Sequence, residues 1–340
     1  MGNEVRDFGK RNIVVIGSSA GGIEALIKLF SGLPRDSSAS FLVTQHLSPH
    51  SASELDRILQ KCTQMHVAFA QDRQLLMPDT VYLAPRDRHL MIEGNCVRIT
   101  RGPKECRARP AVDVLFRSAA LAFGPRVIGV ILTGALDDGT AGLWQIKDRN
   151  GLAFVQDPDE AQYSSMPTSA IEHVKVDCVG SIDTLVSEIV KALATEVPLP
   201  EAPASSQRLA IETLIAFEGN GMQAGVMSLG QVSKYTCPEC HGVLVQIEEG
   251  GGVRFRCHTG HAYSPQSLLV EVNEAIDKGL WDTIRAIEER ILLLQQRADT
   301  AEAAGKVDVA LQLRTEAERV IEKYQPLRAL VLDSSFFSSD

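Results

Sequence analysis

Short apolar runs that alternate with amphipathic helical segments are the feature that most constrains how this 340-residue chain can fold. A run that is apolar at every position is typical of a strand buried on both faces of a parallel sheet. Six such strands are expected, at 13–16, 41–44, 81–84, 127–132, 152–156 and 176–179. The alternation predicts an α/β domain with a Rossmann-like, doubly wound, mainly parallel sheet.

Two local patterns refine this expectation. Residues 90–92 and 96–99 lie on either side of Glu93-Gly94-Asn95, which predicts a small antiparallel hairpin. The last helix of the domain is expected to begin after Ser181, because a serine at the N-cap accepts a hydrogen bond from a free helical N–H group. The first domain is therefore predicted to span residues 8–196.

The rest of the chain is expected to form smaller parts. Residues 197–230 begin with the proline-rich stretch VPLPEAPASSQ, which predicts a linker, and a short helical pattern around 209–217 follows within this tether. From Pro265, apolar residues recur every three or four positions in two stripes, with a break near Gly305. This pattern predicts an α-helical hairpin over 265–330, preceded by a small module at 231–264.

The small module carries cysteine and histidine residues with the spacing of a metal site. Cys237 and Cys240 are three residues apart, and Cys257 and His261 follow after a predicted β-hairpin. Two such pairs on facing turns can bind zinc tetrahedrally, and four protein ligands leave no position open for a substrate. We therefore predict a zinc-ribbon-like module with a structural Zn²⁺. His258 is an alternative ligand, but it directly adjoins Cys257.

Composition excludes several classes of function. The net charge is −9 and the basic residues are few and dispersed, so nucleic-acid binding is not expected. No apolar run approaches the ~20 residues that a membrane-spanning helix needs, and the N-terminus has no hydrophobic signal segment. A cytoplasmic protein without membrane insertion is expected. The basic segment at 98–109 is a local exception and a candidate contact for an acidic partner.

The turn Gly17-Ser18-Ser19-Ala20-Gly21-Gly22 follows the first strand and precedes an amphipathic helix. The N–H groups of such a turn either bind a phosphate or stabilise an oxyanion while a serine attacks the substrate. The turn matches neither the G-x-G-x-x-G pattern of dinucleotide-binding proteins nor the P-loop, because no lysine follows the glycines. This favours a nucleophilic serine, which is either Ser18 or Ser19.

A nucleophilic serine needs a base and an acid that orients the base. His46 comes directly after the strand at 41–44, and Asp137 and Asp138 follow the strand at 127–132. An open α/β sheet places its active site at the carboxyl ends of its strands, where all of these side chains are expected. The sequence therefore favours a serine hydrolase, with the choice between the two aspartates open.

The first domain resembles the chemotaxis protein-glutamate methylesterase family. The resemblance runs in order over residues 12–195 and rests on several blocks that are specific together. These blocks are the turn at 17–22, Thr44-Gln45-His46, Pro85-Arg86-Asp87-Arg88-His89, Arg109-Pro110-Ala111-Val112-Asp113-Val114-Leu115-Phe116, Gly129-Val130-Ile131-Leu132-Thr133-Gly134, Asp138-Gly139 and Ser165-Met166-Pro167.

The resemblance implies a catalytic triad of Ser19, His46 and Asp138, with no cofactor for catalysis. It implies hydrolysis of methyl esters on glutamate side chains of chemoreceptors, with deamidation of certain glutamines as a side activity, in chemotaxis or a related phosphorelay. The expected protein substrate is the cytoplasmic domain of a methylated chemoreceptor. The chain departs from the family at Ala20, usually threonine, and at Ala135-Leu136, usually Met-Gly, where we expect effects on rate and substrate fit.

Well-known members of the family carry an N-terminal receiver domain, and the resemblance here starts within the first dozen residues. We therefore expect control through the zinc module, the helical hairpin or a separate response regulator. Two alternatives stay open. One is a serine esterase of the same fold with another substrate, and the other is a signalling adaptor whose first domain is vestigial.

Overall fold

A parallel sheet of seven strands lies at the centre of the first domain, in the order β10-β9-β8-β2-β3-β5-β4. The computed structural model describes residues 8–47, 53–198, 207–249 and 252–333. The six predicted strands are confirmed, and β4 is an additional edge strand. The strands are β2 (Ile13–Ser18), β3 (Ser40–Gln45), β4 (His66–Phe69), β5 (Thr80–Leu83), β8 (Val127–Ile131), β9 (Leu152–Gln156) and β10 (Cys178–Gly180).

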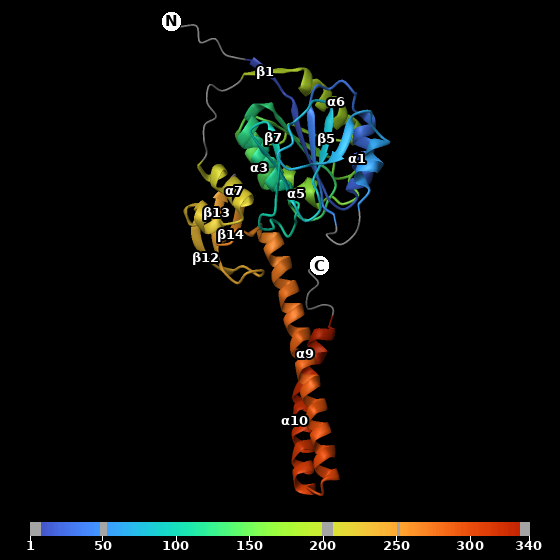
Figure 1. The fold of residues 1–340 in the computed structure, drawn as a ribbon, viewed down its shortest axis with the longest axis vertical. Coiled ribbons are helices and arrows are strands. Elements are labelled where there is room, and N and C mark those ends of the chain that lie inside the picture. Colours follow the sequence, from blue (N-terminus) through green and yellow to red (C-terminus); the bar gives the residue numbers. More distant parts are fainter. Residues whose placement is uncertain (1–7, 48–52, 199–206, 250–251, 334–340) are drawn as a thin grey trace. The chain divides into compact units, whose positions relative to one another are not determined.

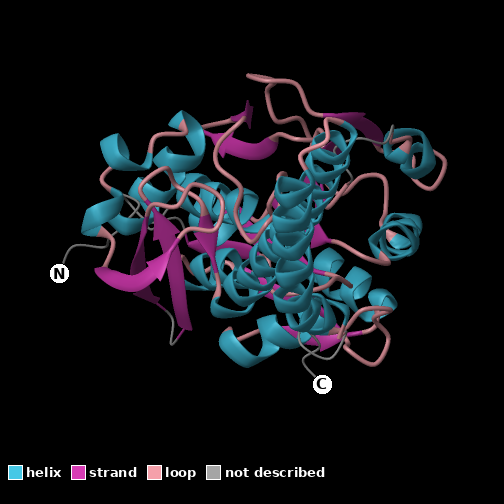
Figure 2. Ribbon diagram, turned by 90° about the horizontal axis from the view of Figure 1, so that it is seen from below, coloured by secondary structure: helices cyan, strands magenta, loops and turns pink. Residues whose placement is uncertain are grey.

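The sheet is doubly wound, because the chain passes from β2 to β3 on one side and later returns to pair β8 with β2 on the other. Helices pack on both faces, through one apolar cluster on each face (Figures 1 and 2). One face carries α1 (Gly22–Gly32), α2 (Leu55–Gln60) and α6 (Ile182–Ala194), and the other carries α3 (Val112–Phe123), α4 (Thr140–Asp148) and α5 (Ser165–His173). Covering both faces explains why the strands are apolar throughout.

Shorter elements complete this domain. The predicted hairpin is confirmed as β6 (His89–Glu93) and β7 (Cys96–Thr100). The predicted cap of α6 is also confirmed, since the Ser181 side chain accepts a hydrogen bond from the Thr184 N–H. At the edge of the domain, β1 (Phe8–Lys10) pairs antiparallel with β11 (Glu196–Pro198), and a 3-10 turn, η1 (Gly124–Arg126), precedes β8.

A helix, α7 (Gln207–Glu218), occupies part of the range for which the sequence predicts a linker. Ala216 is buried against Met91 and Val114 of the first domain, and Ile215 packs in the apolar cluster of the following module. The helix is followed by α8 (Gly221–Ala224) and the turn η2 (Val226–Ser228). Only the proline-rich residues 199–206 of the predicted linker lie outside the described residues. The segment from 207 onward is therefore packed structure and not a tether.

The predicted module forms a four-stranded antiparallel sheet in the order β12-β13-β14-β15. Its strands are β12 (Gln231–Thr236), β13 (Val243–Glu249), β14 (Gly252–Cys257) and β15 (Ala262–Tyr263). A loop of the first domain adds to this sheet, because the Cys106 N–H donates to the Ala262 carbonyl at 2.9 Å and the Ala262 N–H donates to the Lys104 carbonyl at 3.2 Å. The module and the first domain accordingly form one compact unit, Met1–Leu268.

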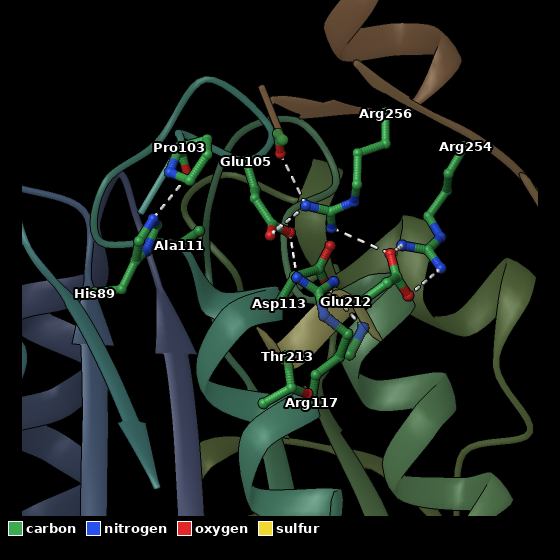
Figure 3. Close-up of polar contacts among 12 residues, drawn as sticks. His89, Pro103, Glu105, Ala111, Asp113, Arg117, Glu212, Thr213, Arg254 and Arg256 are labelled. Carbon is green, nitrogen blue, oxygen red and sulfur yellow. Dashed lines mark hydrogen bonds and ion pairs between the residues drawn. The ribbon is translucent and has the colours of Figure 1, made fainter. Parts of the chain in front are cut away.

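Buried ion pairs join the module to the first domain (Figure 3). Glu105 pairs with Arg117 of α3 and with Arg256 of β14, the second contact at 2.9 Å. Glu212 of α7 pairs with Arg256 at 3.1 Å and with Arg254 at 2.9 Å. These carboxylates and the Arg117 and Arg256 side chains are at most 2% exposed. Glu105 therefore connects elements that are 151 residues apart in the chain, and Glu212 connects α7 to β14.

The second compact unit, Leu269–Asp340, contains two long helices. They are α9 (Pro265–Ala303), which begins just before the unit, and α10 (Val307–Leu332). A buried seam of Ile284, Ile291, Tyr324 and Val331 joins them. Ile276 belongs to the apolar repeat after Pro265, which predicted it to be buried, but it is 42% exposed. No helix among the described residues is both long enough and apolar enough to cross a membrane.

Candidate active site

The turn between β2 and α1 presents one of its two serines and buries the other. Ser18 is the last residue of β2, is fully buried, and donates its hydroxyl proton to Gln45 Oε1 at 2.7 Å. Ser19 is half-buried and its Oγ faces the His46 ring. A hydroxyl that is sealed from solvent and already bonded cannot reach a substrate, so the geometry favours Ser19 as the nucleophile.

The structure brings Ser19, His46 and Asp138 into hydrogen-bond contact. His46 Nδ1 lies 3.1 Å from Ser19 Oγ, and His46 Nε2 lies 2.8 Å from Asp138 Oδ2. Because an ionised carboxylate can only accept a hydrogen bond, the ring proton belongs on Nε2. Nδ1 then offers its lone pair to the serine hydroxyl, which is the arrangement that general-base activation of a serine requires.

These side chains come from three strands that are neighbours in the sheet. Ser19 follows β2, His46 follows β3, and Asp138 follows β8. The connections of the sheet change direction between β2 and β8, and an open α/β sheet forms its ligand site at the carboxyl ends of its strands beside such a switch point.

Helix α3 supports the Asp138 carboxylate. The N–H groups of Val112 and Asp113 donate to its two oxygens at 2.7 and 3.0 Å. Free N–H groups at a helix N-terminus attract a carboxylate, so they hold the Asp138 side chain where it faces His46. Asp137 does not face His46: it lines a cavity of about 120 Å³ beside α4, and burial raises the pKa of its carboxyl. Of the two aspartates, the structure therefore places Asp138 against the histidine.

The glycines of the turn have a steric role. Gly21 has a φ of +71°, and a Cβ there would lie 2.5 Å from the Gln162 side chain. The N–H groups of Ser19 and Gly22 are bonded to the carbonyls of Thr133 and Ser19. Among the hydrogen bonds of the described residues, the N–H groups of Ala20 and Gly21 have no acceptor. They are candidate donors to an oxyanion formed beside Ser19.

Gln45 is a site residue to which the sequence assigned no role. Its Nε2 donates to the carbonyls of Ser19 and His46 at 2.7 and 3.0 Å, while its Oε1 accepts from Ser18. One buried amide thus ties the serine turn to the histidine turn. Its only signal in the sequence was a polar residue at the end of an otherwise apolar strand.

Of the departures from the family pattern, Ala20 lies in the serine turn, and Ala135 and Leu136 lie on the loop before Asp138. Ala135 is exposed, and Leu136 has a φ of +63°. This left-handed conformation favours glycine, the residue that the resemblance leads one to expect at 136. The loop therefore keeps a turn suited to glycine although a leucine stands there.

The basic segment at 98–109 is not a free cationic surface. Arg109 donates to Asp87 at 2.6 Å and to the Gly102 carbonyl, and Arg98 pairs with Asp72 and Glu93. Arg101 and Lys104 also have carboxylate partners. These internal partners neutralise most of the charge that the sequence alone suggested for contacting an acidic protein.

The four predicted metal ligands lie together in the module. The Sγ atoms of Cys237, Cys240 and Cys257 and a ring nitrogen of His261 are all within 4.8 Å of one another. The cysteines are free thiols, and Cys240 Sγ lies 3.5 Å from Cys257 Sγ. The other ring nitrogen of His261 faces Glu239 at 3.4 Å, as is common for a metal-binding histidine.

His258, the alternative ligand, is not part of this cluster. Its ring lies over Gly242, where a Cβ would be 2.0 Å from the Nδ1 atom. Three thiols and one imidazole are a donor set that suits tetrahedral zinc.

A doubly wound parallel sheet that brings a serine, a histidine and an aspartate into contact at its switch point is an architecture suited to ester hydrolysis by a serine. The sequence profile of the CheB methylesterase family matches residues 14–189, just over half of the chain. The chain belongs to this family.

Relatives support this assignment. A protein of Leptospira interrogans, provisionally named a protein-glutamate methylesterase/protein-glutamine glutaminase, is 38% identical over 179 residues, which are 52% of this chain and 93% of the relative. Protein-glutamate methylesterase/protein-glutamine glutaminase 2 of Methanosarcina mazei is 36% identical over 53% of this chain and 52% of its own length.

A solved structure is also similar. The crystal structure of the CheB methylesterase catalytic domain of Thermotoga maritima matches with a TM-score of 0.51 and 32% identity. The match covers 54% of this chain and 99% of that domain. The similarity is therefore confined to about half of this chain.

Proposed function

We propose that this protein is a protein-glutamate methylesterase that uses Ser19 as nucleophile, His46 as base and Asp138 as the acid that orients the base. The observation that carries the proposal is the pair of contacts from Ser19 Oγ to Nδ1 and from Nε2 to the Asp138 carboxylate. The names of the curated relatives support the same activity.

The reaction follows from these contacts. Ser19 Oγ attacks the ester carbonyl while His46 Nδ1 takes the hydroxyl proton, and Asp138 stabilises the imidazolium. The N–H groups of Ala20 and Gly21 bind the oxyanion. Collapse of the tetrahedral intermediate expels methanol, which receives the proton from His46. Water, deprotonated by His46, then hydrolyses the acyl-serine and releases the glutamate. A glutamine side chain would lose ammonia by the same steps.

The protein substrate we propose is the cytoplasmic domain of a methylated chemoreceptor, and the setting is cytoplasmic signal transduction in chemotaxis or a related phosphorelay. A separate response regulator is a candidate partner for control of the enzyme. The alternative substrate is another ester that reaches the same half-buried serine, because a triad does not identify its substrate.

Methanol release from a methylated receptor fragment tests the proposal. Ser19→Ala is expected to lower the rate by about 10⁴-fold or more, and Ser18→Ala is expected to keep a serine that reacts with a fluorophosphonate probe. Turnover of a small methyl ester without turnover of the receptor would indicate another substrate. Absence of both turnover and probe labelling in the wild type would indicate a vestigial domain.

We also infer that residues 231–264 form a zinc-ribbon-like module, with Cys237, Cys240, Cys257 and His261 as ligands of a structural Zn²⁺. The close set of donors and the Glu239 contact support this ligand set. With four protein ligands no position is open for substrate, so the metal would hold the turns at the ends of β12 and β14 and take no part in ester hydrolysis. In this organisation, residues 265–330 are the helical hairpin.

A further inference from the structure

Asp113 and Asp138 cap each other's helices. The Asp138 carboxylate accepts the N–H groups of Val112 and Asp113 at the start of α3. In return, Asp113 Oδ1 accepts the N–H groups of Gly139 at 3.0 Å and Gly142 at 2.6 Å, at the start of α4. The free N–H groups at the start of each helix are therefore hydrogen-bonded to a carboxylate from the start of the other helix.

This interlock leaves little room for movement. Gly139 has a φ of +99°, and a Cβ there would lie 2.7 Å from a Val112 methyl group. Asp113 is 3% exposed, and the cavity of about 120 Å³ that it lines with Asp137 is not lined by Ser19 or His46. Asp113 cannot take part in the chemistry directly, and any effect on catalysis must pass through its contacts.

The contacts of Asp113 lead to the catalytic carboxylate. Gly139 directly follows Asp138, so the bond from its N–H to Asp113 fixes the backbone that carries the Asp138 side chain. Asp138 in turn provides the only hydrogen bond to His46 Nε2 among the described residues. We propose that Asp113 is a positioning residue, which holds the Asp138 loop so that its carboxylate stays in contact with His46. The proposal rests on the triad proposed above.

The electrostatic surroundings decide which substitution is conservative. Burial and then the neighbouring charge of Asp138 raise the pKa of Asp113 to about 7, although Arg117 and Arg254 act in the opposite direction. Because the charged form of this side chain is disfavoured there, an uncharged residue of the same shape is the conservative replacement. An asparagine can accept the same two N–H bonds without any charge, whereas alanine cannot accept either of them.

The test compares Asp113→Asn, Asp113→Ala and a matched control, Ser118→Ala. Ser118 is also buried on α3 and accepts the Ile92 N–H, and the described residues give it no hydrogen bond to the Asp138 loop. For each variant, kcat and KM are measured with a small methyl ester, and the active-site concentration is taken from a burst titration. A second readout is the far-downfield proton resonance of the hydrogen bond between His46 and Asp138.

We expect Asp113→Ala to lower kcat per active site by about 10–100-fold with KM nearly unchanged, because small misplacements of a catalytic group are costly. The downfield resonance should be lost in Asp113→Ala and kept in Asp113→Asn and Ser118→Ala. If Asp113→Ala does not fold, Asp113→Ser replaces it, since a serine hydroxyl is too short to reach the start of α4.

Two results would overturn the proposal. In the first, Asp113→Ala has the same downfield resonance and the same kcat as the wild type. In the second, Asp113→Asn and Asp113→Ala lose kcat to the same extent. The resonance does not depend on turnover. If the wild type shows the resonance but hydrolyses no methyl ester, the proposed function fails while the positioning role of Asp113 is still decided.

Discussion

Replacing Glu105 by glutamine is a sharp test of how the C-terminal module is held on the first domain. Glu105 is 1% exposed and pairs with the guanidinium groups of Arg117 and Arg256. Glutamine has nearly the same shape but no charge. The variant therefore keeps the packing and removes the charge of one of the two carboxylates, Glu105 and Glu212, that pair with the buried guanidinium groups.

The size of the effect follows from the acidity of Glu105. Burial alone would raise its pKa, but the charges of Arg117 and Arg256 outweigh burial and hold the pKa at about 2, against 4.5 for a free side chain. That difference corresponds to ~3 kcal/mol of folding stability at neutral pH. It agrees with the ~3–5 kcal/mol lost when one partner of a buried ion pair is removed. Because the folded-state pKa is the lower one, this stability is present above pH 4.5 and is lost as the pH falls toward 2.

The assay is urea unfolding followed by tryptophan fluorescence in a Trp281→Phe background. Trp144 of α4 then reports on the first unit, and Trp281 of α9 is exposed enough to be replaced with little cost. Glu105→Gln should lower the free energy of unfolding by ~3 kcal/mol at pH 7, with a smaller difference from wild type below pH 4.5.

Glu93→Gln is the matched control, since Glu93 forms an exposed pair with Arg98. Glu93→Gln should lower the free energy of unfolding by at most ~1 kcal/mol. If Glu105→Gln and Glu93→Gln differ by less than ~1 kcal/mol at pH 7, the buried ion pairs do not fix the module in the way the contacts indicate.

Two further predictions concern the proposed zinc site and the loop before Asp138. If Cys237, Cys240, Cys257 and His261 bind zinc as proposed, a chelator or the change Cys257→Ser should release zinc in a colorimetric assay and lower the melting temperature of the first unit in calorimetry. An unchanged melting temperature in the metal-free protein would contradict a structural role. Leu136→Gly should raise the free energy of unfolding by up to ~1 kcal/mol in urea titrations, because relief of the left-handed φ outweighs the added chain entropy. A clear loss of stability would show that contacts of the leucine side chain matter more than its backbone.

The sheet was predictable from the sequence because its strands are buried on both faces. An apolar run such as the one in β2 needs no information about its partners to be recognised as a strand. β4 was not predicted, because it is an edge strand that begins with the exposed His66. α7 was not placed in the packed structure, since the burial of Ala216 depends on Met91, which lies far away in the chain.

The sequence predicts which strand ends carry the side chains of the candidate site. The rule that parallel strands carry their ligands at the carboxyl ends brings Ser19, His46 and Asp138 to one edge. The roles of Gln45 and Asp113 were not predictable, because each acts through hydrogen bonds to residues about 26 positions away. No spacing rule connects such positions.

The same contacts bear on whether the first domain can be separated from the module. Cutting the chain after Thr195 would uncover Met91 and Val114, which α7 buries, and would take Arg256 away from Glu105. Both changes remove contacts of α3, because Val114 and the Glu105 partner Arg117 belong to this helix. The first N–H groups of α3 bind the Asp138 carboxylate. A truncated protein without activity would therefore not show that the module regulates the enzyme, because it would also have lost the support of its own triad. A single substitution such as Arg256→Met keeps the apolar contacts of α7, and Glu212 of α7 keeps its pair with Arg254. It therefore separates the contact between Arg256 and Glu105 from the packing that the catalytic edge of the sheet needs.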